Sequence, residues 1–434
     1  MEPASNEEKE GPATAKAKSN NAPRIVLGVA LPVLLLGFVS LFTDISSEMI
    51  IPVLPDFVTV VLGGTFVSLG FILGVTDAIA NVIKGLSGWL SEHMRGRKKL
   101  IIAGYALSNV VAKPLIGFQT SDVTVALFRV LDRIGKGIRT SPRDALIGYY
   151  GGKDKTGKAF GIHRSMDNLG AVFGPLLAAL LLALAFTSQW VIILSIIPGI
   201  IAVAFIFFVK DIKQEPAIDV GVKSSANPEV ISRRFIKTVA VLATIEFASL
   251  NSGFLIARAN QFFESIVGRG TSLLIGSVLF AVFNIVNAIV SIQAGKLSDR
   301  VGRKKVILVG LVLLLVATIV LAIPWPTDAS SLTFSVVIMC ADFVIFGVYM
   351  GMVDPTSRAM VSDLSEKKKG RSYGLYYLIV GIVSLPEAII FGLLYEKLEF
   401  TIAFSFWSVL LVACILIFTF GVSETLPALV KKST

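Results

Sequence analysis

Charged side chains are scarce in this sequence. Only 16% of its 434 residues are Asp, Glu, Lys or Arg, whereas 54% are hydrophobic and the mean hydropathy is +0.78. A soluble domain carries about a quarter charged residues. The composition therefore argues against an ordinary soluble protein and predicts a polytopic membrane protein.

Residues that build metal, disulfide or nucleotide sites are also few. The chain has two histidines, His93 and His163, and two cysteines, Cys340 and Cys414, which both lie in apolar runs. This usage argues against a metal cluster or a disulfide framework. The sequence also contains no G-x-x-x-x-G-K-S/T motif, which argues against ATP-driven transport by this chain alone. We expect no cofactor, and a membrane-embedded enzyme is a remote alternative.

The formal charge of +10 does not indicate a nucleic-acid partner, because the excess lies in short loops between apolar segments. The first 25 residues are polar and cannot build a core, so we expect a disordered tail there. No basic start followed by a short apolar core and a cleavage site is visible, and we therefore expect no signal peptide.

Apolar segments of bilayer-spanning length, about twenty residues, recur along the chain. They predict an all-α polytopic membrane protein with twelve transmembrane helices. The segments are 27–53, 66–90, 99–118, 122–148, 159–185, 189–209, 235–263, 271–294, 304–323, 332–361, 371–395 and 400–421.

Lysine and arginine concentrate in alternate loops, as at 95–99, 300–305 and 367–371. The opposite loops hold almost none, with Arg269 and Lys397 as the exceptions. Because positive loops stay in the cytoplasm, we expect both termini there, an even number of spans and a location in the inner or plasma membrane of the cell.

A polar segment divides the spans six and six, and the two halves resemble each other. Pro142 precedes the Gly157 of GKAFG by fifteen residues, as Pro355 precedes the Gly370 of GRSYG. A parallel duplication predicts two halves with pseudo-two-fold symmetry and a binding site between them. The expected order is a cytoplasmic tail at 1–25, a six-helix half at 26–210, a cytoplasmic linker at 211–233, a second half at 234–423 and a tail at 424–434.

The loop after the eighth segment, Gly295 to Lys305, reads GKLSDRVGRKK and resembles the loop signature of the major facilitator superfamily. The resemblance extends over about residues 27 to 423 and implies a transporter. Gly295 is expected to allow close helix contact, and the resemblance gives Asp299 a role in holding one conformational state. The earlier copy, GLSGWLSEHMRGRKK, departs from the pattern. The expected gate residues are Gly295, Asp299, Arg300, Gly302 and Arg303, with Gly88 and Glu92 in the earlier copy.

Three further motifs resemble those of twelve-span drug:proton antiporters. Pro52-Val-Leu-Pro55 ends the first segment, and Gly170-Ala-Val-Phe-Gly174-Pro175 lies in the fifth. Arg133-Ile-Gly-Lys-Gly137 resembles the family's R-x-x-Q-G signature, with Lys136 in place of Gln. The resemblance implies a helix bend at Pro52, Pro55, Gly170, Gly174 and Pro175, and a proton-coupling role for Arg133.

The fourth segment carries an unusual row of charges between Leu127 and Asp144. Arg129, Asp132, Lys136, Arg139 and Arg143 follow one another at offsets of three and four, and so share one helical face. Charges inside a bilayer are costly and predict a face turned to a watered cavity. The alternative is an amphipathic helix lying on the membrane surface.

Acidic residues in other segments are candidates for proton transfer. Asp44 and Glu48 lie four apart in the first segment, and Asp44 is the first candidate for the proton carrier. The alternative is a static ion pair with a basic residue of the fourth segment. Glu246 and Glu387 are expected to be isolated in apolar surroundings. The candidate cavity residues are Glu48, Lys136, Arg139, Glu246, Asp354, Arg358 and Glu387.

The sequence thus predicts a secondary active transporter that works by rocker-switch alternating access. The first expectation is proton-coupled export of small amphiphilic or drug-like compounds by a monomer in the lipid bilayer. The alternative substrate is an organic anion or phosphorylated metabolite, because bases outnumber acids by two in the first five segments. The acids are Asp44, Glu48, Asp77, Asp132, Asp144 and Asp167, and the bases are Lys84, Lys113, Arg129, Arg133, Lys136, Arg139, Arg143 and Arg164.

Overall fold

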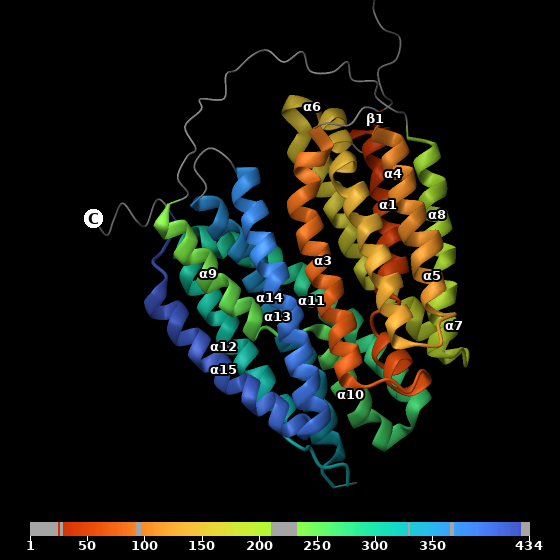
Figure 1. The fold of residues 1–434 in the computed structure, drawn as a ribbon, viewed down its shortest axis with the longest axis vertical. Helices are drawn as coiled ribbons and strands as arrows, with labels where there is room; N and C mark the ends of the chain where they lie inside the picture. Colours follow the sequence, from red (N-terminus) through yellow and green to blue (C-terminus); the bar gives the residue numbers. More distant parts are fainter. Residues whose placement is uncertain are drawn as a thin grey trace, which may run out of the picture.

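The computed structural model describes residues 25–26, 29–92, 97–209, 232–328, 330–364 and 369–426. Long helices dominate this part of the chain, and they gather in two groups that lie side by side (Figure 1). The predicted tails and linker fall almost entirely outside the described residues.

The N-terminal helices, which precede residue 210, form the first group. They follow a two-residue antiparallel pair of strands, β1 (Ile25–Val26) and β2 (Val29–Ala30). They are α1 (Leu31–Glu48), α2 (Leu54–Asp56), the π-helix η1 (Phe57–Val61), α3 (Phe66–Glu92), α4 (Arg97–Ala106), the π-helix η2 (Leu107–Ala112), α5 (Lys113–Ile116), α6 (Asp122–Ala183), α7 (Ser188–Leu194) and α8 (Ile196–Phe207).

The C-terminal helices, which follow residue 231, form the second group. They are α9 (Arg233–Ala248), α10 (Ser252–Val267), α11 (Arg269–Val301), α12 (Arg303–Ala322), α13 (Leu332–Asp363), α14 (Lys369–Lys397) and α15 (Glu399–Gly421). Aromatic side chains pack in their interior, where Phe391 contacts Phe254, Phe404 and Trp407 at ring-centroid distances of 4.6, 5.1 and 5.0 Å.

Within the described residues, eleven helical stretches are long and apolar enough to cross a membrane. Each matches one of the twelve predicted segments. The remaining segment, 122–148, is the first part of α6, and its charges keep it out of that set. The all-α polytopic architecture is confirmed, and the number twelve stays a prediction.

The α6 helix reverses direction along its length. Arg143 Nη1 lies 3.5 Å from Ser40 Oγ, and the same hydroxyl donates to the Asp167 carboxylate. In a straight helix, residues 143 and 167 would be about 36 Å apart, since each residue advances the helix by about 1.5 Å. The first arm of α6, which contains Arg143, and the second arm, which contains Asp167, therefore lie beside each other against α1.

The first predicted span, 27–53, is longer than the helix that the structure contains. Pro32 lies in the first turn of α1, where its missing N–H costs nothing, and residues 49–53 form turns before α2. The segment is largely apolar along its whole length, but its prolines restrict the helix to Leu31–Glu48.

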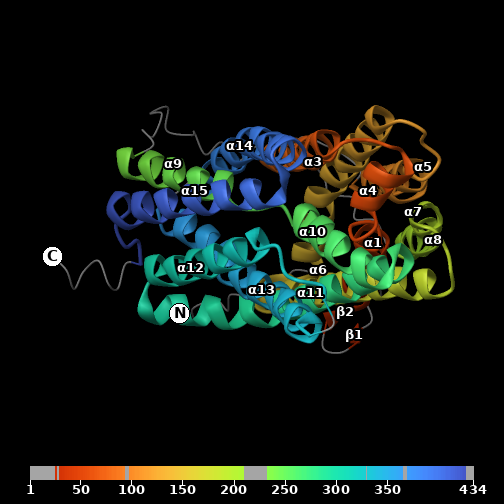
Figure 2. The same cartoon turned by 90° about the horizontal axis from the view of Figure 1, so that it is seen from below.

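The two groups touch along α3 and α14, along α6 and α11, and where α10 meets α2 (Figure 2). The α3–α14 contact is backbone to backbone. A Cβ atom at Gly70 would lie 2.2 Å from the Ala388 carbonyl oxygen, and one at Gly392 would lie 2.3 Å from that of Phe66. Glycine is therefore required at both positions for this approach.

Candidate substrate pathway between the two helix groups

The bundle has two chemically different ends. We call one the basic end, where α4, α9 and α12 begin with Arg97, Arg233 and Arg303. The Lys98 Nζ donates there to the Phe207 carbonyl oxygen at 3.1 Å. We call the other the Arg269 end, after the residue that begins α11.

An ion pair joins the two groups at the Arg269 end. Arg269 Nε lies 2.7 Å from Asp56 Oδ1, and Arg269 Nη2 lies 3.0 Å from Asp56 Oδ2. Asp56 belongs to α2 and is buried, whereas the Arg269 side chain is 42% exposed. This bidentate contact, together with the α3–α14 approach, closes the bundle at that end.

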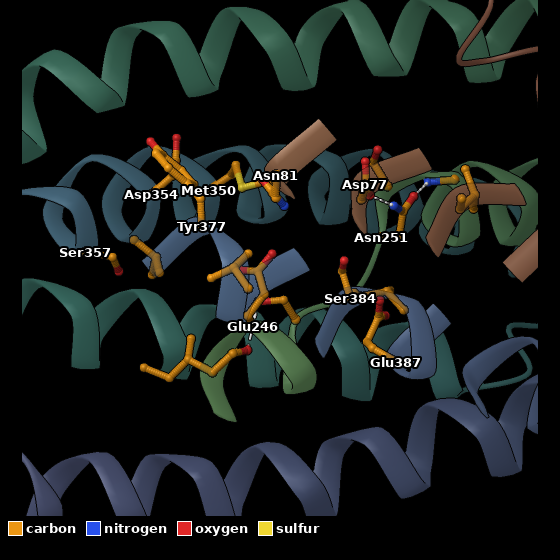
Figure 3. A pocket seen from close by; sticks show the side chains of 18 of the residues that line it. Asp77, Asn81, Glu246, Asn251, Met350, Asp354, Ser357, Tyr377, Ser384 and Glu387 are labelled. Carbon is orange, nitrogen blue, oxygen red and sulfur yellow. Dashed lines mark hydrogen bonds between the residues drawn. The ribbon is translucent and has the colours of Figure 1, made fainter. Parts of the chain in front are cut away.

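A cavity of about 410 Å³ lies between the groups (Figure 3). Its N-terminal wall includes Asp77 of α3 and the arginines Arg129 and Arg133 of α6. The residues that α9, α10, the turn between them, α13 and α14 contribute to the cavity form what we call the C-terminal wall. The polar and charged members of that wall include Glu246, Ser249, Asn251, Tyr349, Asp354, Arg358, Tyr376, Tyr377, Ser384 and Glu387.

A second cavity, of about 530 Å³, extends from the first toward the basic end. The two share Arg133, Arg358 and Tyr377 as lining residues. The second cavity is also lined by Asp44 and by polar residues of both α6 arms, among them Lys136, Arg139, Arg143, Arg164 and Asp167. A polar pathway therefore leads from the middle of the bundle to its basic end.

The charged row of α6 is packed inside the protein. Arg129, Asp132 and Arg139 are each no more than 3% exposed, so the interpretation of a helix on the membrane surface is wrong. Arg133, Lys136 and Arg139 line the larger cavity, and the Arg139 guanidinium lies 4.2 Å from the Tyr105 ring centroid. No described residue bonds the Nε atom of Arg129, Arg133 or Arg139.

Behind this row lies a buried polar network. Lys113 is 0% exposed, and its Nζ donates to Asn109 Oδ1 at 2.7 Å, while Asn109 Nδ2 donates to Thr43 Oγ1 at 2.9 Å. Ser108 Oγ donates to Asp132, whose carboxylate lies 3.9 Å from Arg133 Nη1 and whose charge also acts on Lys113. Lys113 and Asp132 are recognisable in the sequence as charges within apolar segments. The network itself cannot be predicted, because its hydroxyl and amide members have no distinctive spacing.

Asp44 lines the larger cavity, and Glu48 lies one turn further along α1. Neither carboxyl forms a hydrogen bond or ion pair within the part of the chain that the structure describes, although Lys136 and Arg139 share the cavity wall with Asp44. The static ion pair is therefore absent in this conformation. The charges of Asp44, Lys136 and Arg133 all act on Glu48.

The G-x-x-x-G-P motif of the second α6 arm packs on α1 beside these acids. A Cβ at Gly170 would lie 2.8 Å from Asp44 Cβ, and a Cβ at Gly174 would lie 2.8 Å from Glu48 Cβ. Pro175 continues inside α6, while Pro52 and Pro55 flank the start of α2, and Pro55 lines the smaller cavity.

The predicted acids of the C-terminal helices are not isolated, contrary to the sequence-based expectation. Glu246 and Glu387 line the same cavity as Asp77, because α3, α9 and α14 converge there (Figure 3). Asp354 and Arg358, one turn apart on α13, form an ion pair with each other. The sequence separates these residues by up to 310 positions, so only the fold brings them together.

The predicted gate motif lies at the basic end. Asp299 Oδ1 accepts from Arg303 Nη1 at 2.6 Å, and Arg303 Nε reaches Asp363 Oδ2 at 3.1 Å. Gly302 has φ +106°, which disfavours other residues there. The expectation for Gly295 is wrong in this conformation, since a Cβ there would meet nothing within 4 Å. Arg300 is exposed, whereas the structure does not describe the surroundings of Gly88 or the side chain of Glu92.

The architecture is that of a polytopic membrane protein with a polar pathway between two helix groups. The family model of the Major Facilitator Superfamily matches residues 36–268 and 262–434. The chain belongs to this superfamily, and it is a secondary transporter.

Relatives and solved structures agree with this assignment. The chain is 34% identical over 386 residues to the MFS-type transporter MJ1317 of Methanocaldococcus jannaschii, a match that covers 87% of this chain and 92% of that protein. A nucleoside transporter, NupG, shares the fold at a TM-score of 0.71 with 13% identity, covering 90% and 98% of the two chains. A D-xylose–proton symporter does so at 0.68 with 14% identity, covering 91% and 98%.

Proposed function

We propose that this protein carries a small anionic molecule across a cell membrane by proton-coupled alternating access. The observation that carries the proposal is the position of Arg133, which lines both cavities and keeps an unbonded Nε. A guanidinium binds carboxylate or phosphate in a bidentate manner, and such charge-assisted bonds are stronger than neutral ones.

Alternating access fits the difference between the two ends. The larger cavity lies toward the basic end, while Asp56 and Arg269 join the groups at the opposite end. We assign the basic end to the cytoplasm, since positive loops stay on that side. Rocking of the two groups would break the Asp56–Arg269 pair and close the basic end.

Asp44 is our candidate for the proton carrier, with Arg133 as its coupling partner. The Asp44 carboxyl shares a cavity with the cations that would hold the anion. Protonation of Asp44 would remove a negative charge from that cavity and so favour the entry of an anion. This arrangement links proton binding to substrate binding without contact between the two.

Proton-coupled export of drug-like cations is the second candidate. Tyr349, Tyr376 and Tyr377 lie beside Glu246 and Glu387 in the smaller cavity, and aromatic rings with carboxylates suit an amphiphilic cation. The surplus of arginine on the opposite wall makes this candidate weaker.

Thermal unfolding of the purified protein separates the two candidates. The panel consists of inorganic phosphate, sugar phosphates, dicarboxylates and tetraphenylphosphonium. A ligand at about 100 times its Kd stabilises the folded state by about 2.7 kcal/mol. We expect an anion to raise the Tm. A rise with the lipophilic cation alone would overturn the anion proposal in favour of drug export.

Proton coupling is tested in proteoliposomes with an anion that binds. Asp44→Asn should abolish uptake driven by a pH gradient and leave exchange between internal and external anion intact. The matched control is Asp328→Asn. Asp328 lies in the loop before α13, where hydroxyls of Ser330 and Ser331 lower the pKa of its carboxyl to about 2. Gradient-driven uptake that survives in Asp44→Asn would remove Asp44 from the coupling role.

A further inference from the structure

The helix that lines the C-terminal wall is broken inside the cavity. The α9 helix ends at Ala248 and α10 starts at Ser252, and the three residues between them all line the cavity. The break is held in place by side chains: Ser249 Oγ bonds Tyr349 Oη at 2.7 Å, and Asn251 Oδ1 accepts from the Gly253 N–H at 2.9 Å. The cavity therefore contains a rigid, polar turn of backbone.

Asn251 connects two carboxyl groups from opposite helix groups at this break. Its Nδ2 donates to Asp77 Oδ2 at 2.8 Å, and its backbone N–H faces the carboxylate of Glu387. Glu246 lies on the same wall, in the last turn of α9 before the break. Three acids from α3, α9 and α14 thus line the same cavity as this turn of backbone (Figure 3).

One carboxylate oxygen of Glu387 has no hydrogen-bond donor among the described residues. The side chain is only 5% exposed and lines the cavity, yet its Oε1 has no hydrogen-bond donor among the described residues. A buried carboxylate oxygen without a donor is destabilising, and natural proteins rarely leave one unfilled. The strongest charge influences on Glu387 are Glu246 and Asp77, which are both negative. The free Oε1 of Glu387 therefore suits a positively charged donor.

We infer that the C-terminal wall is a subsite for a protonated amino group, so that the transported molecule is a zwitterion with its anionic group on the arginines of α6. The inference rests on the proposed function and adds the second group of the substrate. An ammonium carries three N–H donors, of which one can bond the free Oε1 of Glu387 and the others can bond further oxygens of the wall. Arg358 does not fill this role, because it pairs with Asp354.

A sodium ion is the main competing occupant. It would need several converging oxygen atoms, whereas Asn251 presents an amide N–H2 to Asp77 and uses its Oδ1 to cap α10. Donor groups in the wall leave fewer oxygens for a metal ion and suit a ligand that itself donates. The observations therefore favour the amine.

Matched pairs of anions test the inference in the purified full-length protein. One series pairs β-alanine, γ-aminobutyrate and 5-aminovalerate with propionate, butyrate and valerate. A second series pairs 2-aminoethylphosphonate with ethylphosphonate. All are supplied as potassium salts, with sodium in a separate arm, and the Tm is measured at several concentrations to obtain Kd. We expect the amino member of at least one pair to bind about tenfold more tightly or better, as hydrogen bonds between charged groups provide.

Variants assign that preference to the wall. Glu387→Gln should abolish the advantage of the amino member, so that both members of a pair bind with about equal Kd, and Asp77→Asn gives a second variant if the first does not fold. The matched control is Asp342→Asn. Asp342 is also buried without a partner among the described residues, but it lies outside the residues that line this cavity. The control should keep the full advantage.

The outcomes distinguish failure of this inference from failure of the proposed function. Equal binding of both members of every pair, or stabilisation by sodium without any effect of the amine, would overturn the subsite and leave the anion proposal standing. No binding by any anion, with or without an amine, would overturn the anion proposal and the subsite together.

Discussion

Lys113 among the N-terminal helices and Asp342 among the C-terminal helices are both ionisable side chains with almost no exposed surface, 0% and 1%. Lys113 is surrounded by Asn109, Thr43 and the charge of Asp132. Neither carboxylate oxygen of Asp342 has a hydrogen-bond partner among the described residues. These two side chains thus represent two different environments for a buried charge, one with several polar neighbours and one without a hydrogen-bond partner.

The difference bears on how each wall of the pathway works. Around α6, the buried network holds charges in place before any ligand arrives, and such preorganisation suits a site that selects an anion. In the C-terminal helices, Oε1 of Glu387 has no hydrogen-bond donor among the described residues, which suits a carboxyl that changes its partner during transport. We regard the N-terminal wall as the rigid side of the pathway.

The largest expected difference in the free energy of unfolding comes from removing one buried charge from each group of helices. Asp132→Asn removes the negative charge that pairs with Arg133 at 3.9 Å and that also acts on the buried Lys113, and loss of such a buried charge costs about 3 kcal/mol. Asp342→Asn should change the free energy of unfolding by less than about 1 kcal/mol, since a buried carboxyl without a partner contributes little to stability. Denaturation of both variants in the same detergent provides the measurement, and equal losses would contradict the contrast.

The second prediction concerns the functional wall. Arg133→Gln should weaken binding of the best anion by about 30-fold or more, since a charge-assisted bond in a dry site is worth about 2 kcal/mol. Arg233→Gln, which changes an exposed arginine at the start of α9, should bind as the wild type does. Kd values from thermal shifts provide the comparison. An Arg133→Gln protein with unchanged Kd would exclude the rigid wall as the anion site.

The third prediction tests the contact between the groups. Gly70→Ala places a Cβ 2.2 Å from the Ala388 carbonyl oxygen, and overpacking of this kind costs about 1–3 kcal/mol. The control is Gly161→Ala in α6, where a Cβ would meet nothing within 4 Å, and which should be neutral or slightly stabilising. A Gly70→Ala protein as stable as the control would mean that α3 and α14 separate easily.

The smallest expected effect belongs to the ion pair that closes the Arg269 end. Because Arg269 is partly exposed, the pair contributes about 1 kcal/mol, which shifts a two-state equilibrium about fivefold. Asp56→Asn should therefore raise the labelling rate of a cysteine introduced at Leu54 in the cavity by an impermeant reagent added from the Arg269 side. Exchanging the charges, as Asp56→Arg with Arg269→Asp, should restore the original rate. A rate unaffected by Asp56→Asn would exclude the pair as a latch.

Much of the fold could be predicted from the sequence. Apolar spans of this length form helices in a bilayer, because every backbone polar group must be hydrogen-bonded within the protein. The three- and four-residue spacing of the charges in α6 predicts that they share one helical face. The loop signature at Asp299 and the G-x-x-x-G-P motif at Gly170 were local enough to read. The expectation for Gly295 failed because close approach depends on a partner helix that the sequence does not name.

Other features were beyond sequence reasoning. Asp56 and Arg269 are separated by 213 positions, and Asp77 and Asn251 by 174. Neither pair has a spacing that periodicity can detect, and serine, threonine and asparagine of the Lys113 network occur throughout the chain. Glu246 and Glu387 looked isolated because each has apolar neighbours in sequence.

The sequence by itself determined the class of this protein, because hydropathy, loop charge and helical period act over short distances along the chain. The tertiary structure alone decided which charges share a cavity, which end is closed and which carboxyl lacks a partner. These properties depend on contacts between helices of the two groups. Packing of apolar faces brings those helices together, and this packing cannot be predicted from the spacing of the polar residues.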